Sequence, residues 1–568
     1  MKKIKGISKL TLVAFIGIGV LVVTGFSTSS DSRNFEIIKS LDIFYSLFRE
    51  LNSYYVDEIE PEKLINSGIE AMLESLDPYT NYFPESEVDD LHFMTTGEYA
   101  GIGAIITKRG KYVVISEPYE GFPAQESGLK AGDRIIEING ENMVGKDTSD
   151  ASDKLKGPAQ TQVKVKIERP GTVGFLEFNI TRKLIHINAV PYYGMLNKET
   201  GIIIFSNFTV DCYLEVENAF NDLKNNHNMK NLIIDMRGNP GGVMDEAVKV
   251  ANLFLPRGSE IVSTKGKVTQ WDKTYRAPKE PLDEEIPIIV LISRGSASSS
   301  EIVAGALQDY DRAVIVGQRS FGKGLVQAPR NLAYNAKLTI TTAKYYIPSG
   351  RCIQAVDYSH RNEDGSVGYI PDSLIKKFQT KGGRTVFDGG GISPDIITPV
   401  DNYPNLVFAL IFQQTFFDFV TEYTINKPPI ATPDKFVLSD DVYEEFKKYV
   451  VSLSDFKYQS ESKEQLKKLI DMAKREGYYE NLQDSFTEIE NGLMPDVERD
   501  MDIFKKEVSE LLSIELMKRN YFQKGAIIFS IKDDNEVTQA IETLADKDKY
   551  KGMLNGTILT CASDKRVK

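Results

Sequence analysis

Apolar residues recur at helical spacing near both ends of the chain and follow strand-like patterns between them. Spacings of three and four residues place such residues on one face of a helix. The stripes are Ile37, Leu41, Tyr45 and Phe48 in the first part, then Val442, Phe446, Tyr449 and Val450, and finally the mostly apolar set Val508, Leu511, Leu512 and Glu515. The pattern therefore predicts helical regions over residues 31–96 and 401–568.

A second helix is predicted within the first of these regions. Pro61 suits the first turn of a helix, where its missing N–H costs nothing. Leu64, Ile65, Ile69 and Leu73 then follow at helical spacing. A turn-forming run over residues 77–81 ends this helix.

The segment between the helical regions divides into two parts. Over residues 97–184 strand patterns dominate: Val163, Val165 and Ile167 alternate with two lysines, which indicates a strand buried on one face. Over residues 185–400 strands alternate with helices, the pattern of an α/β domain. We therefore expect a multidomain α/β chain, with a β-rich domain that precedes or is inserted into a larger α/β core.

The first 30 residues carry an export pattern. Lys2, Lys3, Lys5 and Lys9 precede the uncharged, largely apolar stretch Leu10–Phe26. A basic region followed by an apolar one is typical of a signal peptide, and its length also suits a single membrane anchor. Both interpretations predict an exported protein of the cell envelope, in the periplasm or on the outer face of the inner membrane. A buried core helix is the structural alternative.

Composition narrows the class of protein. Of the 568 residues, 41% are hydrophobic and 26% are charged, which excludes a wholly disordered chain and a multi-spanning membrane protein. The net charge of −13 comes without a basic stripe, so we expect no nucleic-acid partner. The three cysteines lie far apart, and their spacing suits neither a zinc site nor a disulfide framework.

A run over residues 123–140 resembles the PDZ family. It reads Pro-Ala-Gln-Glu-Ser-Gly-Leu-Lys-Ala-Gly-Asp-Arg-Ile-Ile-Glu-Ile-Asn-Gly. In that family a Gly-hydrophobic-Gly-hydrophobic loop binds the terminal carboxylate of a peptide, a role that the resemblance assigns to Gly101, Ile102, Gly103 and Ala104. Glycines let the backbone approach a ligand, clustered N–H groups bind an anion, and a peptide extends a sheet edge. An ordinary glycine turn is the alternative.

Two strand-to-turn sequences in the α/β region are candidates for acyl chemistry. One strand runs into Asn239-Pro240-Gly241-Gly242, whose paired glycines let backbone N–H groups face a ligand. Another strand ends in a serine-rich run over residues 293–300, before a helix. A hydroxyl there lies near unsatisfied N–H groups and the positive end of the helix dipole. Helix capping by Ser299 or Ser300 is the structural alternative.

A third strand leads into Phe321-Gly322-Lys323-Gly324. If residues 323–327 are extended, Lys323 and Gln327 point to the same face. A solvated surface charge is the alternative interpretation of this lysine.

The sequence offers few bases for a serine nucleophile. The Gly-x-Ser-x-Gly pattern is not met, and none of the four histidines adjoins the three turns. His227 lies in a polar loop. A Ser-His-Asp triad is possible in space, but the sequence does not support one. Residues 320–323 match Ser-x-x-Lys of the penicillin-recognising enzymes, but the neighbouring glycines disfavour the helix that this motif needs. A Ser–Lys dyad remains.

Together these motifs make the chain resemble the carboxy-terminal processing peptidases, or tail-specific proteases, which are secreted serine endopeptidases. The resemblance covers nearly the whole chain and implies a ClpP/crotonase-like core. The implied parts are a signal peptide or anchor (1–30), a helical region (31–96), a PDZ domain (97–184), a protease core (185–400) and a helical region (401–568). The last part matches least well in type.

The resemblance also implies a role for each turn. The family's Ser-Ala-Ser-x-Ser-Glu run contains the nucleophile, its Phe-Gly-Lys-Gly turn the base, and its Asn-Pro-Gly-Gly turn an oxyanion donor. The implied residues are Ser298 as nucleophile, Lys323 as base, Gln327 as its support, and Gly241 or Gly242 together with the N–H of Ser299 as oxyanion hole.

The implied reaction places a demand on the lysine. Its amine is protonated at neutral pH, so burial near residues such as Phe321, Leu325 and Val326 must lower the pKa of Lys323 well below its ordinary value of about 10.4. The resemblance implies that the reaction needs no metal or organic cofactor and that the substrates have free C-terminal tails. Whether two copies of the chain form a homodimer stays open. Two alternatives are an envelope scaffold with an inactive core, and an acyl-transfer enzyme that acts on a small molecule.

Overall fold

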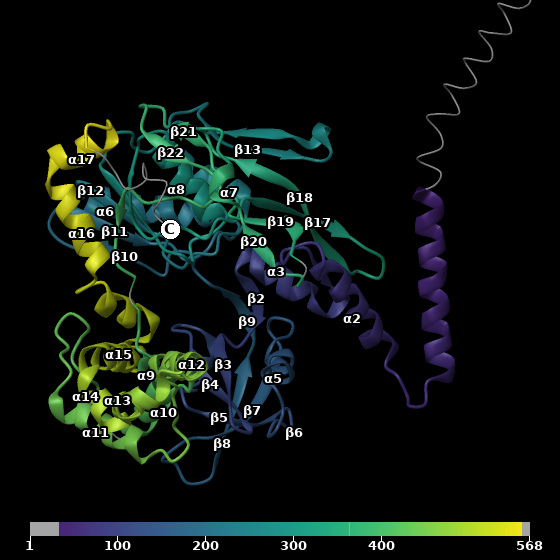
Figure 1. Cartoon of the computed structure of the whole chain (residues 1–568), viewed down its shortest axis with the longest axis vertical. Helices are drawn as coiled ribbons and strands as arrows, with labels where there is room; N and C mark the ends of the chain where they lie inside the picture. The colour runs from purple at the N-terminus through teal and green to yellow at the C-terminus, as the bar shows by residue number, and fades with distance from the viewer. Residues whose placement is uncertain (1–32, 363, 401, 426, 559–568) are drawn as a thin grey trace, which may run out of the picture. The chain divides into compact units, whose positions relative to one another are not determined.

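The computed structural model of the chain describes residues 33–362, 364–400, 402–425 and 427–558 (Figure 1). Contacts cluster into two units that divide after residue 82. The predicted export segment lies outside the described residues. In the part that is described, no helix combines the length and the apolar content that a membrane span needs.

The N-terminal unit contains the two predicted helices. One covers residues 33–54, and the other is α2 (Pro61–Glu74), with Pro61 in its first turn. The apolar stripe of the first helix is exposed, with Leu41 62% accessible. After α2 the Asp77 carboxylate accepts two backbone N–H bonds and forms the predicted turn. Strand β1 (Asn81–Phe83) spans the boundary between the units.

The β-rich domain is an antiparallel sheet with strand order β3-β4-β5-β7-β8 and β6 beside β5. Its elements are β3 (Ala104–Arg109), β4 (Tyr112–Pro118), α4 (Pro123–Glu126), β5 (Arg134–Ile138), β6 (Glu141–Asn142), α5 (Thr148–Leu155), β7 (Gln162–Glu168) and β8 (Phe175–Thr181). The alternation predicted for β7 is confirmed, since Val163, Val165 and Ile167 are fully buried. Strand β3 lies at an edge of this sheet, the position that a peptide needs to extend it.

This domain is inserted into the α/β core rather than placed before it. Helix α3 (Val88–Thr96) and β2 (Glu98–Gly101) precede the domain, and β9 (Lys183–His186) follows it and pairs with β2. Helix α3 is tied to the core, because the Val210 N–H donates to the Thr95 carbonyl at 2.9 Å. The chain therefore leaves the core at β2 and returns at β9.

The α/β core is built on a sheet of order β10-β11-β12-β15-β16-β23, in which β10 is antiparallel to its neighbour and the other pairs are parallel. A second, antiparallel sheet includes β13, β14, β17 and β18, and two hairpins pair β19 with β20 and β21 with β22. The elements are η1 (Glu85–Glu87), β10 (Tyr192–Met195), β11 (Thr200–Ile204), α6 (Cys212–Asn226), β12 (Asn231–Asp235), α7 (Met244–Asn252), β13 (Glu260–Gly266), η2 (Thr269–Trp271), β14 (Lys273–Arg276), β15 (Ile288–Ile292), α8 (Ser299–Asp309), β16 (Val314–Gly317), β17 (Leu325–Asn331), β18 (Lys337–Tyr346), β19 (Val356–Arg361), β20 (Val367–Tyr369), η3 (Asp372–Leu374), β21 (Lys377–Gln379), β22 (Thr385–Phe387) and β23 (Ile396–Ile397).

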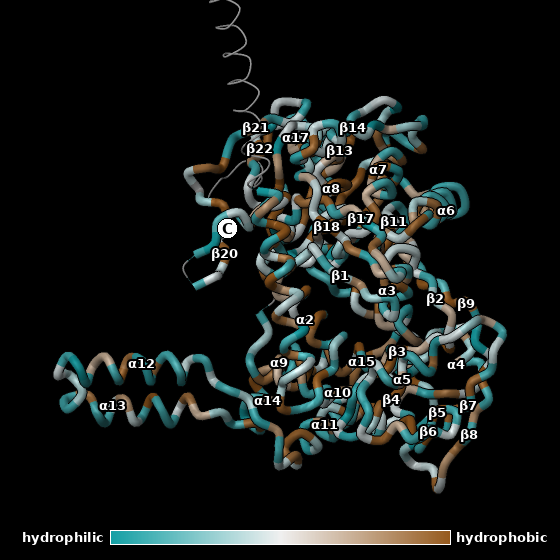
Figure 2. The backbone as a smooth tube through the Cα atoms, turned by 90° about the vertical axis from the view of Figure 1, so that its right-hand side faces the viewer, coloured by the Kyte–Doolittle hydropathy of each residue, from teal (hydrophilic) through white to brown (hydrophobic). Residues whose placement is uncertain are grey.

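The C-terminal region is helical, as predicted. Its helices are α9 (Asn405–Phe412), α10 (Thr415–Tyr423), α11 (Asp440–Ser452), α12 (Glu461–Glu476), α13 (Tyr479–Gly492), α14 (Val497–Ile503), α15 (Lys505–Ser530), α16 (Asn535–Ala545) and α17 (Lys547–Leu554). Figure 2 shows the α12–α13 hairpin projecting from the other helices, with a largely hydrophilic sequence.

These helices contact both other parts of the larger unit (Figure 1). Helices α10 and α15 contact the β-rich domain, where the Arg109 guanidinium donates to the Asp418 carboxylate of α10 and Arg519 of α15 donates to the Ala131 carbonyl. Helices α16 and α17 cover one face of the core sheet, and their apolar residues pack on strands β11, β12, β15 and β16. There Arg237 pairs with Asp534 at 2.7 Å and with Glu536 at 2.6 Å. The C-terminal region therefore bridges the β-rich domain and the core.

Candidate active site

The three predicted turns meet at one edge of the core sheet. They follow β12, β15 and β16, which are adjacent parallel strands, so their carboxyl ends lie side by side. The Ala297 N–H donates to the Asn239 carbonyl, joining the first two turns at 3.0 Å. The Phe321 N–H donates to the Ser296 carbonyl, joining the last two at 3.0 Å. Segments distant in sequence thus form one site.

Ser298 lies on a sharp turn between β15 and α8. Its φ of 53° and ψ of −113° are a strained conformation for a residue with a side chain. Helix α8 begins at Ser299, so Ser298 itself holds the N-cap position, rather than Ser299 or Ser300. A strained strand-to-helix turn of this kind exposes a nucleophilic serine in other hydrolases, although here the Gly-x-Ser-x-Gly pattern is absent. Ser298 is partly accessible between the buried Ala297 and Ser299.

Hydroxyl groups around this turn hold it in place. The Ser299 hydroxyl donates to the Gly242 carbonyl at 3.0 Å, and the Ser300 hydroxyl to the Asn239 carbonyl at 2.9 Å. The Tyr345 hydroxyl donates to the Ser298 carbonyl at 3.1 Å. Three hydrogen bonds thus offset the backbone strain at Ser298.

The glycine turn requires glycine because of its close approach to Ser298. A Cβ atom at Gly241, where φ is +95°, would lie 2.7 Å from the Ala297 carbonyl oxygen and 2.8 Å from the Ser299 nitrogen. A Cβ atom at Gly242 would lie 2.3 Å from the Phe208 carbonyl oxygen. The Gly241 N–H donates to the side-chain oxygen of the buried Asn239 at 2.9 Å. The glycine turn that carries the predicted oxyanion donors therefore lies beside the predicted nucleophile. The Gly241 N–H is already hydrogen bonded to Asn239.

The lysine turn differs in detail from the sequence expectation. Lys323 is partly buried, but Phe321, expected to help bury it, is 49% exposed. Strand β17 begins only at Leu325, and its pairing with β18 shifts register between Val326 and Gln327. The regular alternation of side chains along a strand therefore does not relate Lys323 to Gln327. The reason is the glycine on each side of the lysine, which keeps it in a loop before the strand.

Gln327 is fixed by the neighbouring strand. Its side-chain Nε2 donates to the Thr341 hydroxyl at 3.1 Å. The amide of Gln327 is thereby held at a defined orientation on β17.

Glu301 is the residue of this site that the sequence analysis did not assign. It is fully buried in the first turn of α8. One carboxylate oxygen accepts the N–H groups of Ser298 at 2.8 Å and Lys323 at 2.9 Å. The other accepts the Ser320 hydroxyl at 2.5 Å and the Gly322 N–H at 2.7 Å. A single carboxylate therefore joins the backbone of the predicted nucleophile to that of the predicted base.

Burial dominates the electrostatics of this carboxylate. Desolvation raises the pKa of Glu301 to about 7, although its four donors favour the ionised form. The nearby Tyr345, which is also buried, has a pKa well above its ordinary value for the same reason. The Glu301 carboxyl group that connects the two turns therefore titrates near neutral pH.

The histidine alternative gains no support from the fold. His227 follows α6 and precedes the amino end of β12, whereas the glycine turn follows the carboxyl end of that strand. Its imidazole lies 3.5 Å from the Asp222 carboxylate.

The predicted peptide-binding loop, residues 101–104, lies between β2 and the edge strand β3. The carbonyls of Ile102 and Gly103 accept N–H groups from residues 124 and 119, at 2.7 and 2.9 Å. Ile102 is buried in the domain core, and Gly103 has a φ of +74°. Two carbonyls are thus tied back to the domain, which fixes the path of the loop.

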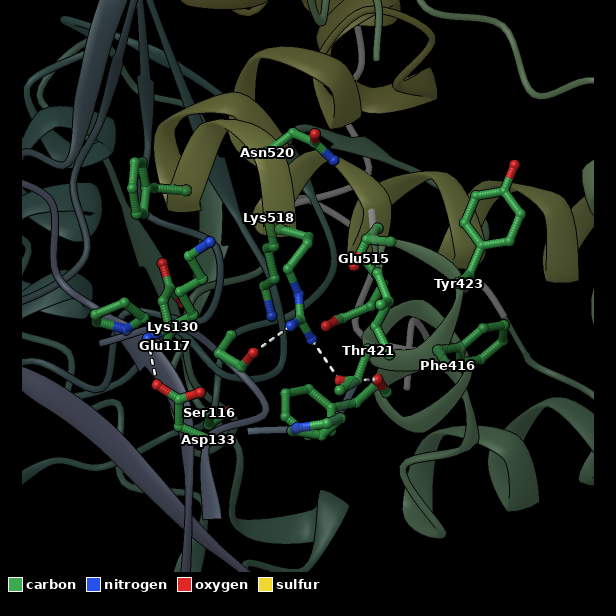
Figure 3. Close-up of a pocket in the computed structure, with 18 of the residues that line it drawn as sticks. Ser116, Glu117, Lys130, Asp133, Phe416, Thr421, Tyr423, Glu515, Lys518 and Asn520 are labelled. Atoms are coloured by element: carbon green, nitrogen blue, oxygen red, sulfur yellow. Dashed lines mark hydrogen bonds between the residues drawn. The ribbon is translucent and has the colours of Figure 1, made fainter. Parts of the chain in front are cut away.

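A separate cavity of about 1060 Å³ lies between the β-rich domain and the C-terminal helices (Figure 3). Arg519 crosses it and donates to the Thr421 hydroxyl at 2.6 Å and to the Ala131 carbonyl. Its wall carries charges of both signs, including Glu515 and Lys518. None of its lining residues belongs to the three turns, so this cavity is distinct from the candidate active site.

Comparisons with known proteins agree with this arrangement. The sequence model of peptidase family S41 matches residues 199–360, a PDZ domain model matches residues 114–169, and a model described as the probable PDZ-protease C-terminal helical domain matches residues 406–544. A carboxy-terminal-processing protease of Bartonella bacilliformis is 36% identical over 366 residues, 64% of this chain and 81% of that protein. A probable CtpA-like serine protease of Staphylococcus aureus is 32% identical over 61% of this chain and 67% of that protein.

Solved structures include similar proteins. The photosystem II D1 C-terminal processing protease is 27% identical, over 64% of this chain and 93% of that chain, with a TM-score of 0.34. The PDZ domain of a carboxy-terminal protease from Vibrio cholerae, solved in complex with a peptide, is 31% identical over 16% of this chain and 99% of that chain, with a TM-score of 0.15.

The fold and the sequence matches define a peptidase of family S41 with an inserted PDZ domain and a helical C-terminal region. The chain belongs to the carboxy-terminal-processing proteases of that family and is a serine-type peptidase. The family and fold class predicted from the sequence are confirmed.

Proposed function

We propose that this protein is an exported endopeptidase that captures the free C-terminal tail of its protein substrates and cleaves them with a Ser298–Lys323 dyad. One observation carries the proposal. The Glu301 carboxylate binds the backbone N–H groups of both Ser298 and Lys323, so the strained serine turn and the lysine turn are built as one unit. A purely structural serine would not require this strain or this connection.

The proposed reaction proceeds through an acyl-enzyme. The neutral amine of Lys323 removes the hydroxyl proton of Ser298, and the serine oxygen attacks the carbonyl carbon of the scissile peptide. The protonated lysine then gives this proton to the leaving amine. Water attacks the acyl-enzyme and loses a proton to the lysine, which returns it to the Ser298 oxygen as the bond to the acyl group breaks. This releases the carboxylic acid product and restores the serine hydroxyl and the neutral amine. No metal or organic cofactor takes part in this scheme.

Two groups of backbone donors are proposed to stabilise the oxyanion. One is the N–H of Ser299, directly after the nucleophile. The other belongs to Gly241 or Gly242. Because the Gly241 N–H donates to Asn239, its use requires a shift of the Asn239 side chain. We assign Gln327 to orient the lysine amine, since its bond to Thr341 fixes its amide group.

The PDZ domain is proposed to deliver the substrate. The loop Gly101–Ala104 would bind the terminal carboxylate through its N–H groups, and the tail would extend the sheet along β3. The support is the edge position of β3 and the loop path fixed by the tied-back carbonyls. A tail bound there would raise the local concentration of substrate at the core.

Location and assembly are further parts of the proposal. The basic and apolar pattern before residue 30 leads us to place the mature protein in the cell envelope, as a secreted or singly anchored form. The exposed apolar stripe of the first helix suits a homodimer. Cell fractionation tests the first part, and sedimentation of the purified protein tests the second.

The central test is cleavage of an unfolded protein such as casein. We expect the purified chain to cleave it, and both Ser298→Ala and Lys323→Ala to be inactive while their thermal unfolding stays cooperative. Lys377→Ala, which changes an exposed lysine of β21, serves as the matched control and should retain full activity. Cleavage by Ser298→Ala would refute the assigned nucleophile.

A further inference from the structure

Arg237 lies at the start of the glycine turn, two residues before Asn239. Its guanidinium forms a two-pronged pair with Asp235, from Nε to Oδ1 at 3.0 Å and from Nη2 to Oδ2 at 2.6 Å. The backbone N–H of Arg237 donates to the same carboxylate at 2.9 Å. The remaining nitrogen, Nη1, is bound by Asp534 and Glu536 of the C-terminal region. Three carboxylates therefore hold this side chain of the turn.

The two carboxylates from the C-terminal region are themselves fixed at the start of α16. One oxygen of Asp534 caps this helix and accepts the N–H groups of Glu536 and Val537 at 2.8 and 2.9 Å, while its other oxygen faces Arg237. Glu536 uses its remaining oxygen to accept the Thr398 hydroxyl at 2.5 Å. The orientation of both carboxylates is thus set by bonds that do not involve Arg237.

Apolar contacts already attach α16 to the core. Val537, Ala540 and Leu544 of this helix are buried against the core sheet. Partly buried ion pairs add little to such attachment, because the cost of desolvation offsets the attraction. What a guanidinium held by several carboxylates does provide is a defined direction. The cluster around Arg237 therefore favours a role in orientation over a role in attachment.

The turn that Arg237 begins reaches the serine turn directly. Asn239 is fully buried, and its carbonyl accepts the Ala297 N–H at 3.0 Å while its side chain accepts the Gly241 N–H at 2.9 Å. Because a single residue separates Arg237 from Asn239, a shift of the arginine moves the segment that carries these bonds. The place of the proposed oxyanion donors relative to Ser298 is therefore linked to the cluster.

We propose that Asp534 and Glu536 are positioning residues of the peptidase, which hold Arg237 so that the glycine turn presents its N–H groups to the developing oxyanion. This inference rests on the proposed function, because it concerns the oxyanion hole of the Ser298–Lys323 dyad. It makes the start of α16 a support of the active site, in addition to the bridge that the C-terminal region forms.

The test replaces both acids by their isosteric amides, Asp534→Asn and Glu536→Gln, in the full-length chain. Arg237 keeps Asp235 as its partner, and asparagine caps a helix as well as aspartate, so the fold should be retained. The substrate is a quenched fluorescent decapeptide that spans the main casein cleavage site mapped with the parent.

We expect kcat to fall about tenfold or more in the double variant, with KM within about twofold of the parent, because a contact that acts only in the transition state changes kcat. Glu536→Gln alone should lower kcat in the same sense, and it decides the matter if the double variant does not fold. A peptide boronic acid, whose serine adduct resembles the tetrahedral intermediate, gives a readout that does not depend on the folded fraction. Its Ki should rise about tenfold.

Tyr550→Phe is the matched control. It removes a hydroxyl of α17 that bonds to the backbone of Ile288, at the end of β15 away from the serine turn. The change perturbs a contact of the same region with the same sheet, and it should leave kcat, KM and Ki unchanged. Circular dichroism at the assay temperature gives the folded fraction of each variant.

Each result has a distinct meaning. Parent-like kcat and Ki in the folded double variant overturn the proposal, as does a fall in kcat that only matches the loss of folded protein. An equal effect of Tyr550→Phe would assign the change to attachment of the C-terminal region and also overturn it. Casein cleavage that requires Ser298 but not the two acids removes this inference alone. If the parent does not cleave casein, or Ser298→Ala does, the proposed function itself is wrong, and the inference fails with it.

Discussion

The most informative perturbation is Glu301→Gln, because this carboxylate joins the two turns of the proposed dyad. Each oxygen accepts two donors, from Ser298 and Lys323 on one side and from Ser320 and Gly322 on the other. Glutamine keeps the shape but supplies one carbonyl oxygen and one NH₂ group. Whichever way its amide is placed, at least one backbone N–H then faces a donor.

Glu301→Gln should change the rate of cleavage much more than the free energy of unfolding. A buried donor left without an acceptor costs about 1–3 kcal/mol, and loss of about 2 kcal/mol at the dyad lowers the rate about 30-fold. Burial of the ionised Glu301 is itself unfavourable, since its pKa of about 7 exceeds the ordinary 4.5. At roughly 1.36 kcal/mol for each pKa unit, glutamine removes a cost of about 3 kcal/mol at pH 8. We therefore expect a large loss of activity with little loss of stability.

The pH dependence follows from the same shift. Since the pKa is raised in the folded state, the folded protein binds this proton more tightly, so Glu301 makes stability fall as pH rises from about 4.5 to about 7. Activity should change in the opposite sense, because only the ionised carboxylate accepts all four donors. We expect casein cleavage to decline below about pH 7 in the parent. Glu301→Gln should lack this component of the profile.

The assay is the initial rate of casein cleavage between pH 5.5 and 9, together with urea unfolding at pH 8. Glu246→Gln, a buried glutamate of α7, is the matched control and should stay within about threefold of the parent. Parent-like activity of Glu301→Gln at pH 8 would refute the claim that this carboxylate aligns the dyad. A proportionate loss of stability and activity would instead mean that the residue only supports the fold.

Three further predictions address the surroundings of the site. Gly241→Ala places a Cβ 2.7 Å from the Ala297 carbonyl oxygen and should lower casein cleavage about 100-fold or more, whereas Gly140→Ala, where the space is open, should not. Arg237→Ala leaves the carboxylates of Asp534 and Glu536 without their cation and should cost about 3–5 kcal/mol in urea unfolding, against under about 1 kcal/mol for the exposed Arg276→Ala. Tyr550→Phe removes a hydroxyl bonded to the backbone of Ile288 at 2.9 Å and should cost about 1 kcal/mol in thermal unfolding without changing cleavage. Parent-like cleavage by Gly241→Ala, or parent-like stability of Arg237→Ala or Tyr550→Phe, would contradict the corresponding contact.

Sequence patterns predicted the helices, strands and turns of this chain better than the tertiary contacts between them. The three turns were identified because each follows a short apolar strand, and adjacent parallel strands then bring their ends together. The role of Glu301 was not predicted, since its partners are backbone N–H groups whose positions depend on the strand order. The burial expected from Phe321 was wrong, because this residue is 49% exposed in the loop between β16 and β17. Local pattern therefore indicates candidate residues, whereas tertiary packing decides their environment.

The ring of Tyr99 in β2, which packs edge-to-face on Phe93 of α3 with centroids 5.3 Å apart, illustrates the same limit. Its position before a glycine loop is visible in the sequence, but whether a ring turns toward the loop depends on packing against Phe93. The bridge made by the C-terminal region is similar, since Arg237 and its partner Asp534 are nearly three hundred residues apart. Contacts of this range have no signature in a single sequence.

The proposed peptidase chemistry depends most directly on Ser298 as the attacking nucleophile. The decisive measurement is rapid acid quenching of the full-length protein during casein cleavage, followed by peptide mapping by mass spectrometry. We predict an acyl group on Ser298 in the parent and none in Lys323→Ala. An acyl group on a different residue, or turnover retained by Ser298→Ala, would contradict the account.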